Sequence, residues 1–187
     1  MKTFLLNLAG LLIAAAVASC GEDTTVSHTI SPQEPGPDSI AYYCGMTISE
    51  HTGPKGQIFL KDQQKPIWFA SVRDTLAFTM MPGEPNNIAA IFVSDVGKAK
   101  RWDQLEAGAW VDANEAIFVA GSNVQGGMGA AELVPFAKRA AAEQFQAKHG
   151  GEIYRLGDLP ERYILGEADV QTSSASDPDA ASKDMAH

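Results

Sequence analysis

Two polar stretches confine the part of this 187-residue chain that can fold. Residues 21–38 are rich in proline, serine, threonine and acidic side chains, and residues 166–187 form a low-complexity polar tail. Neither stretch has enough apolar side chains to offset the entropy that ordering would cost. We therefore expect a tether over residues 20–40, a disordered acidic tail over 166–187, and between them a folded part of about 125 residues, an ordinary domain size.

The N-terminus resembles the signal of a bacterial lipoprotein. Lys2 supplies a positive start, an apolar run follows over residues 4–17, and Val17-Ala18-Ser19 leads with small side chains to Cys20. The apolar run is too short for a comfortable membrane span. We predict a signal peptide over residues 1–19 and a membrane lipoprotein whose Cys20 carries the lipid and which faces the periplasm, from either the inner or the outer membrane. An ordinary secretory signal cleaved nearby is the alternative.

The charge balance excludes some partners. The formal net charge is −9, and loss of Lys2 with the signal peptide would lower it by one, to −10. A strongly acidic protein is repelled by nucleic acid and by anionic lipid head groups. We therefore expect no nucleic-acid partner, and a membrane contact that depends on the lipid anchor.

Apolar patterns predict the first set of elements. They indicate strands over residues 57–60 and 66–70, a helix over 72–80, and a buried strand over 88–93. Pro82-Gly83-Glu84-Pro85 would stop the helix.

A similar order follows in the second half. Strands over residues 110–112 and 115–120 could pair across Ala113-Asn114, and a strand over 153–156 closes the series. A helix is expected over residues 132–149, with Pro135 in its first turn, where no amide donor is needed. The chain is thus expected to be an α+β protein of two tandem ββαβ units, over residues 41–97 and 98–165. Each unit would be a small sheet covered by one helix.

Cys44-Gly45-Met46 holds the only thiol left once Cys20 is acylated. A thiolate and a thioether are soft ligands, and together they favour Cu(I). Spacing by two residues places both sulfurs on one side of an extended segment, and Gly45 would let the backbone bend. The alternative is a buried Cys44 with Met46 packed beside it.

Two further residues could complete such a site. Met128 lies among glycines in residues 126–129, which is a poor place for a core side chain but a good one for a mobile thioether. The alternative is a methionine that plugs the start of the following helix. His51 could add an imidazole ligand, or it could be a solvent-facing loop histidine. Met80 and Met81 are expected in the core.

No catalytic motif accompanies these residues. The sequence lacks H-x-x-x-H, C-x-x-C, G-x-S-x-G and a phosphate-binding loop. A Cys44–His51 nucleophile pair is conceivable, but no orienting residue or oxyanion hole is marked. We therefore predict that the protein is not an enzyme.

Together these features resemble the NosL family of periplasmic lipoproteins, which are required for assembly of nitrous oxide reductase. The resemblance rests on Cys44-Gly45-Met46 with His51, on GPKGQI at residues 53–58, on WFASVRD at 68–74 and on GGMGA at 126–130. It covers nearly all of residues 42–165. It implies tandem ββαβ domains, similar to a fold also seen in organomercurial lyases, and Cu(I) bound by Cys44, Met46 and Met128. Relatives often have histidine at the position of His51, whose role as a ligand stays open.

The resemblance also implies a function. It points to a membrane-anchored Cu(I) chaperone that delivers copper for assembly of nitrous oxide reductase, through a membrane ABC-type maturation complex. Two thioethers and a thiolate would leave the ion open to an incoming ligand. The alternatives are a non-catalytic scaffold lipoprotein of that complex and, as the weaker one, a thiol-dependent enzyme similar to an organometal lyase.

Overall fold

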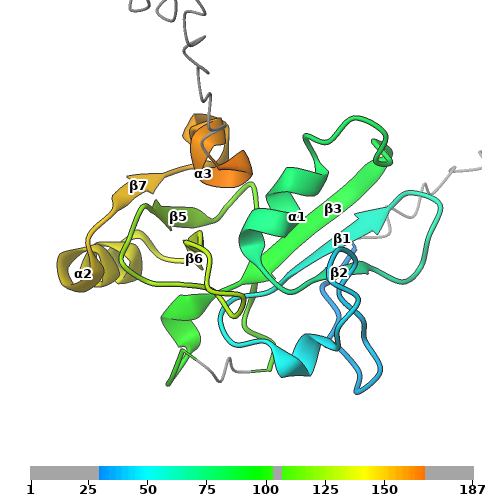
Figure 1. The fold of residues 1–187 in the computed structure, drawn as a ribbon, viewed down its shortest axis with the longest axis horizontal. Helices are drawn as coiled ribbons and strands as arrows, with labels where there is room; N and C mark the ends of the chain where they lie inside the picture. Colours follow the sequence, from blue (N-terminus) through cyan, green and yellow to red (C-terminus); the bar gives the residue numbers. More distant parts are fainter. Residues whose placement is uncertain (1–29, 103–106, 167–187) are drawn as a thin grey trace, which may run out of the picture.

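The computed structural model describes residues 30–102 and 107–166, so the predicted signal peptide, Cys20 and the tail after residue 166 lie outside the described residues. Two small antiparallel sheets and their helices make up the fold (Figure 1). The first sheet has the strand order β2-β1-β3-β4. Its elements are β1 (Gly56–Leu60), β2 (Ile67–Phe69), α1 (Val72–Phe78), β3 (Ile88–Ser94) and β4 (Trp110–Asp112).

The first three strands and α1 confirm the predicted ββαβ order. Every residue of β1 is buried, because this strand lies between β2 and β3 and under α1. The helix begins after Ser71, whose hydroxyl accepts the backbone N–H of Asp74 at 3.0 Å, a normal N-terminal cap. Phe78 at its end packs with Ile58 and Phe69 in a core cluster of this sheet.

The second sheet repeats the order. It consists of β5 (Ile117–Ala120), β6 (Val134–Phe136) and β7 (Glu152–Tyr154), in the order β6-β5-β7. The helix α2 (Arg139–His149) packs on all three strands (Figure 1). A second ββαβ unit is therefore present. Its β5 and β7 correspond to the predicted strands over residues 115–120 and 153–156, whereas β6 takes the place of the predicted strand over 110–112.

The predicted pairing of residues 110–112 with 115–120 is wrong. β4 instead pairs with β3, with Ser94 opposite Trp110. A turn stabilised by the Asp112 carboxylate, which accepts the N–H of Asn114 at 2.8 Å, then directs the chain into the second sheet. The boundary between the sheets therefore follows β4, not residue 97 as predicted. β4 completes the free edge of β3. A strand of only three residues carries no sequence signal for the sheet edge with which it will pair.

The predicted start of the long helix is also wrong. Residues 134–136 form β6, and α2 begins at Arg139. Pro135 is tolerated because β6 is an edge strand, where one missing amide breaks no central ladder. Leu133, Val134 and Phe136 are buried by the sheet, so the apparent helical spacing joined residues of two elements.

One core joins the two units. Val72 and Leu76 of α1 share a cluster of buried side chains with Phe118 of β5 and with Ile164 of a short final helix, α3 (Glu161–Leu165). Figure 1 shows α1 between the first sheet and the second unit. Single turns of 3-10 helix lie at η1 (Ile48–Glu50), η2 (Val96–Lys98) and η3 (Leu156–Asp158). Within the described ranges no helix has both the length and the apolar character to cross a bilayer.

The predicted tether over residues 20–40 ends earlier than expected. The backbone N–H of Gln33 donates to the side chain of Gln57 at 2.9 Å, and its carbonyl accepts from the same side chain at 3.0 Å. Glu34 accepts the indole N–H of Trp110 at 2.8 Å. The fully buried Gln57 amide needs polar partners, and residue 33 supplies them, so the chain joins the fold before residue 40.

Candidate metal centre

A tight turn presents Cys44 and Met46. Residues 40–47 form a small hairpin in which the N–H of Ala41 donates to the carbonyl of Met46 at 2.8 Å. Gly45 has a φ of 69°, in the left-handed region that glycine adopts readily. The two sulfur residues therefore lie on a turn and not on an extended segment.

The sheet fixes this hairpin in place. The N–H of Tyr42 donates to the carbonyl of Trp68 in β2 at 2.8 Å, next to a parallel bridge between Ala41 and Trp68. Both tyrosine hydroxyls, of Tyr42 and Tyr43, donate to the carboxylate of Glu84 at 3.0 and 3.2 Å. The position of Cys44 is thus held from both sides.

His51 lies beside Cys44. Its Nε2 is 3.4 Å from the Cys44 sulfur, and the side chain is buried, with 8% exposed. His51 directly follows η1, and its N–H closes that turn onto the carbonyl of Ile48. The alternative of a solvent-facing loop histidine is therefore wrong. Cys44 itself is half-buried and packs against the cluster of Ala41, Ile48 and Ala70.

The glycine-rich loop places Met128 at the same end of the molecule. A bridge between Gln125 and Ala131 closes this loop. Gly127 packs directly on the His51 segment: a Cβ on Gly127 would lie 2.8 Å from the carbonyl oxygen of Thr52 and 3.2 Å from Cβ of His51. The loop that carries Met128 therefore rests on the backbone that carries His51.

The methionines differ in exposure. Met46 is 46% exposed and Met128 is 55% exposed, so neither is a core residue, and Met128 does not plug the start of α2. Met80 packs against the shared core, as predicted. Met81, also expected in the core, is 43% exposed because α1 ends at Phe78 and the chain turns outward.

A small pocket of about 130 Å³ lies between Met128 and the start of α1, where Ser71 and Asp74 line it. Burial raises the pKa of Asp74, while the Ser71 side chain and the charges of Arg73 and His51 act to lower it. Nowhere in residues 30–102 and 107–166 do three His, Cys, Asp or Glu side chains gather as metal ligands.

Two buried ionisable residues beneath the site were missed by sequence reasoning. Lys55 is 8% exposed, and burial lowers its pKa to about 8. Glu132 is 3% exposed, and burial raises its pKa to about 8. A lysine between Pro54 and Gly56, just before a buried strand, was the one sequence signal that pointed to the first of them.

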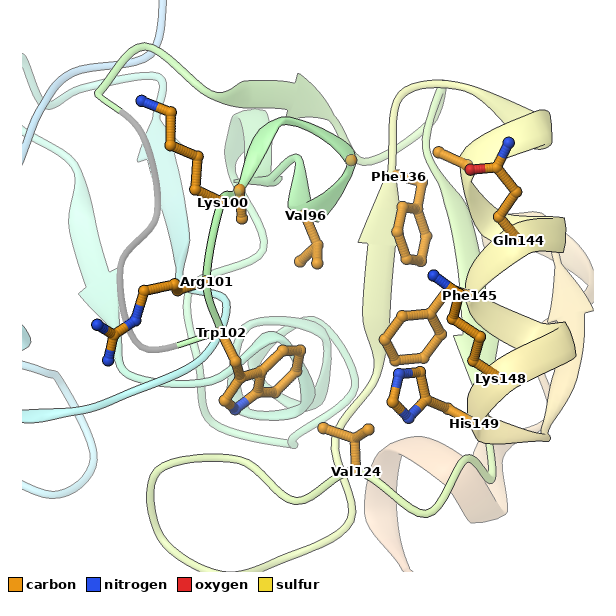
Figure 2. A pocket seen from close by; sticks show the side chains of 13 residues that line it. Val96, Lys100, Arg101, Trp102, Val124, Phe136, Gln144, Phe145, Lys148 and His149 are labelled. Atoms are coloured by element: carbon orange, nitrogen blue, oxygen red, sulfur yellow. The ribbon is translucent and has the colours of Figure 1, made fainter.

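A larger cleft of about 490 Å³ lies elsewhere, between α2 and the loop after η2 (Figure 2). Figure 2 shows Trp102 facing Phe145 and His149 across it. None of Cys44, Met46, His51 and Met128 lines this cleft, so it is separate from the sulfur residues.

Comparisons with known proteins place this chain among relatives of one family. The sequence profile of the NosL family matches residues 32–164. The copper-binding lipoprotein NosL of Achromobacter cycloclastes is 39% identical over 171 residues, which cover 89% of this chain and 88% of that protein. The copper-binding lipoprotein NosL of Stutzerimonas stutzeri is 29% identical, and the match covers 91% of this chain and 88% of that protein. The crystal structure of the copper chaperone NosL from Shewanella denitrificans is similar with a TM-score of 0.65 and 29% identity, covering 70% of this chain and 96% of that one.

Proposed function

The chain belongs to the NosL family, and from that premise we propose that it is a membrane-anchored periplasmic Cu(I) chaperone that supplies copper for assembly of nitrous oxide reductase. The observation that carries this proposal is the convergence of three segments. The Cys44 sulfur lies 3.4 Å from His51, and the loop of Met128 packs on the backbone beside His51. The names of the relatives, which bind copper or act as copper chaperones, support the same ion.

The proposed ligands are Cys44, Met46 and Met128. A thiolate and two thioethers match Cu(I) in softness, and the thioethers carry no proton that the metal must displace. His51 either adds an imidazole ligand or holds the Cys44 sulfur in place through the 3.4 Å contact. The half-exposed Met46 and Met128 side chains can leave the ion one at a time, which is what transfer to an acceptor requires.

Lipidation of Cys20 would hold the protein at the membrane face and raise its encounter rate with membrane-bound partners. We propose that these partners are nitrous oxide reductase and an ABC-type maturation complex. The protein acts without turnover in this proposal. Among the described residues Cys44 is the only cysteine, whereas carbon–metal bond cleavage of the organomercurial lyase type would ordinarily use more than one free thiol.

The direct test is a Cu(I) competition titration of residues 21–187 against a chromophoric chelator. We expect tight binding of one Cu(I), abolished by Cys44→Ser and weakened by Met46→Ala and Met128→Ala. The change in Cu(I) affinity of His51→Ala in the same titration shows how much the imidazole contributes to binding. Met81→Ala is the matched control, because Met81 is exposed to a similar degree and is not a proposed ligand. Unchanged affinity in Cys44→Ser would refute the proposed site.

Delivery needs a test of its own. In cells that make nitrous oxide reductase, replacing the chain by Cys44→Ser should lower the copper content of the isolated reductase, while Met81→Ala should not. A fully loaded reductase in the Cys44→Ser strain would refute delivery and leave copper binding intact.

A further inference from the structure

Lys55 folds back beneath the segment that carries His51. Its ammonium donates to the carbonyl of Thr52 at 3.1 Å and to that of Gly53 at 2.7 Å. Its own backbone is held by Ser94 at the end of β3, whose hydroxyl accepts the N–H of Lys55 at 3.0 Å. Lys55 therefore ties the His51 segment to the first sheet from inside the protein.

Glu132 has the corresponding position under the Met128 loop. Its Oε1 accepts the N–H of Leu133 at 3.0 Å and that of Arg73, at the start of α1, at 3.4 Å. Its Oε2 lies so close to Gly126 that a Cβ there would be 2.5 Å away. The carboxyl group is thus enclosed by the Met128 loop and anchors that loop to α1.

These two anchors act on one contact between loops. Lys55 fixes the carbonyl of Thr52, and that same carbonyl leaves no space for a Cβ on Gly127. A shift of either loop would therefore move Met128 relative to Cys44 and His51.

We propose that Lys55 and Glu132 are positioning residues that set the spacing between the His51 and Met128 loops, so that the Met128 thioether reaches the ion held by Cys44. Neither residue touches the ion. This inference rests on the proposed Cu(I) function. It explains why a lysine and a glutamate are buried under a site to which they contribute no ligand, since ligand groups bind well only when the residues behind them hold their positions.

The test is a double-mutant cycle in the same Cu(I) titration. Lys55→Met should weaken binding by about tenfold or more, the usual effect of removing a support behind a metal ligand. In a Met128→Ala background the same change should have little further effect, because no thioether is left to position. Equal losses in the two backgrounds would overturn the proposal.

Glu132 gives a conservative comparison. Glu132→Gln keeps an oxygen that can accept the two backbone N–H groups and should retain the affinity, whereas Glu132→Leu should lose it as Lys55→Met does. Gln57→Met is the control, since it replaces a fully buried polar side chain that holds residue 33 instead. It should lower stability and leave Cu(I) affinity unchanged. An affinity loss in Gln57→Met equal to that in Lys55→Met would overturn the proposal.

A copper-free measurement separates this inference from the proposed function. Without metal, Lys55→Met should speed hydrogen exchange of the Gly126 and Gly129 amides, which are both bonded within the Met128 loop. Gly127→Ala should do the same by forcing the loops apart, even where Lys55→Met fails to fold. If the wild type binds no Cu(I), the proposed function fails. If it binds Cu(I) but exchange in this loop is unchanged in the variants, the positioning role fails.

Discussion

Replacing Met128 by alanine should weaken Cu(I) binding strongly while the fold keeps nearly all its stability. Truncating a fully buried methionine costs about 2–5 kcal/mol, since apolar area is lost and a cavity remains. Met128 is 55% exposed and lies among glycines, so less than half of its surface is buried and the neighbouring chain can relax. We therefore expect a loss of about 1 kcal/mol or less in the free energy of unfolding.

The Cu(I) affinity, unlike the stability, should fall strongly. Removal of one sulfur ligand should weaken Cu(I) binding by about tenfold or more, equivalent to about 1.4 kcal/mol. Urea denaturation gives the stability and chelator competition gives the affinity. Leu133→Ala is the internal comparison, because Leu133 is 1% exposed and its truncation should cost about 2–5 kcal/mol. Unchanged copper affinity together with a stability loss as large as that of Leu133→Ala would show that Met128 is a packing residue.

Other predictions concern the fold itself. The pKa of Glu132 is raised from 4.5 to about 8, so between these pH values the folded chain holds a proton that the unfolded chain has lost. Stability should therefore fall as pH rises through this window, and Glu132→Gln should remove that part of the slope in urea denaturation. Gly45→Ala should cost about 1 kcal/mol, because a Cβ there meets no atom but φ is 69°. Gly56→Ala should prevent folding at 37 °C as judged by circular dichroism, because its Cβ would overlap the Thr75 side chain.

The sequence predicted those elements whose signals are local. β3 contains a continuous apolar run over residues 88–93, β1 is apolar after Gln57, and the apolar pattern over residues 72–80 indicated α1. The partner of β4 depended on which sheet edge was open, which only the tertiary structure decides. Pro135 is compatible with an edge strand as well as with a helix start, so the residues around it could not show which of the two forms.

The residues of the candidate site likewise differ in whether a local sequence signal pointed to them. Cys44, Met46 and Met128 could be chosen because sulfur has its own chemistry and because glycines make a poor core. The contact of Cys44 with His51 was open in the sequence, since seven residues of loop can take many paths. Lys55 and Glu132 were missed because charged residues are normally exposed, and their burial follows from two loops that meet only in the folded chain.

The packing of Gly127 on Thr52 crosses the seam between the two ββαβ units. The Cys44 hairpin is attached to β2, while the Met128 loop runs from β5 to β6. With the proposed ligands, the ion would link the Cys44 hairpin of the first unit to the Met128 loop of the second. Loss of the ion would remove that cross-link between the two units.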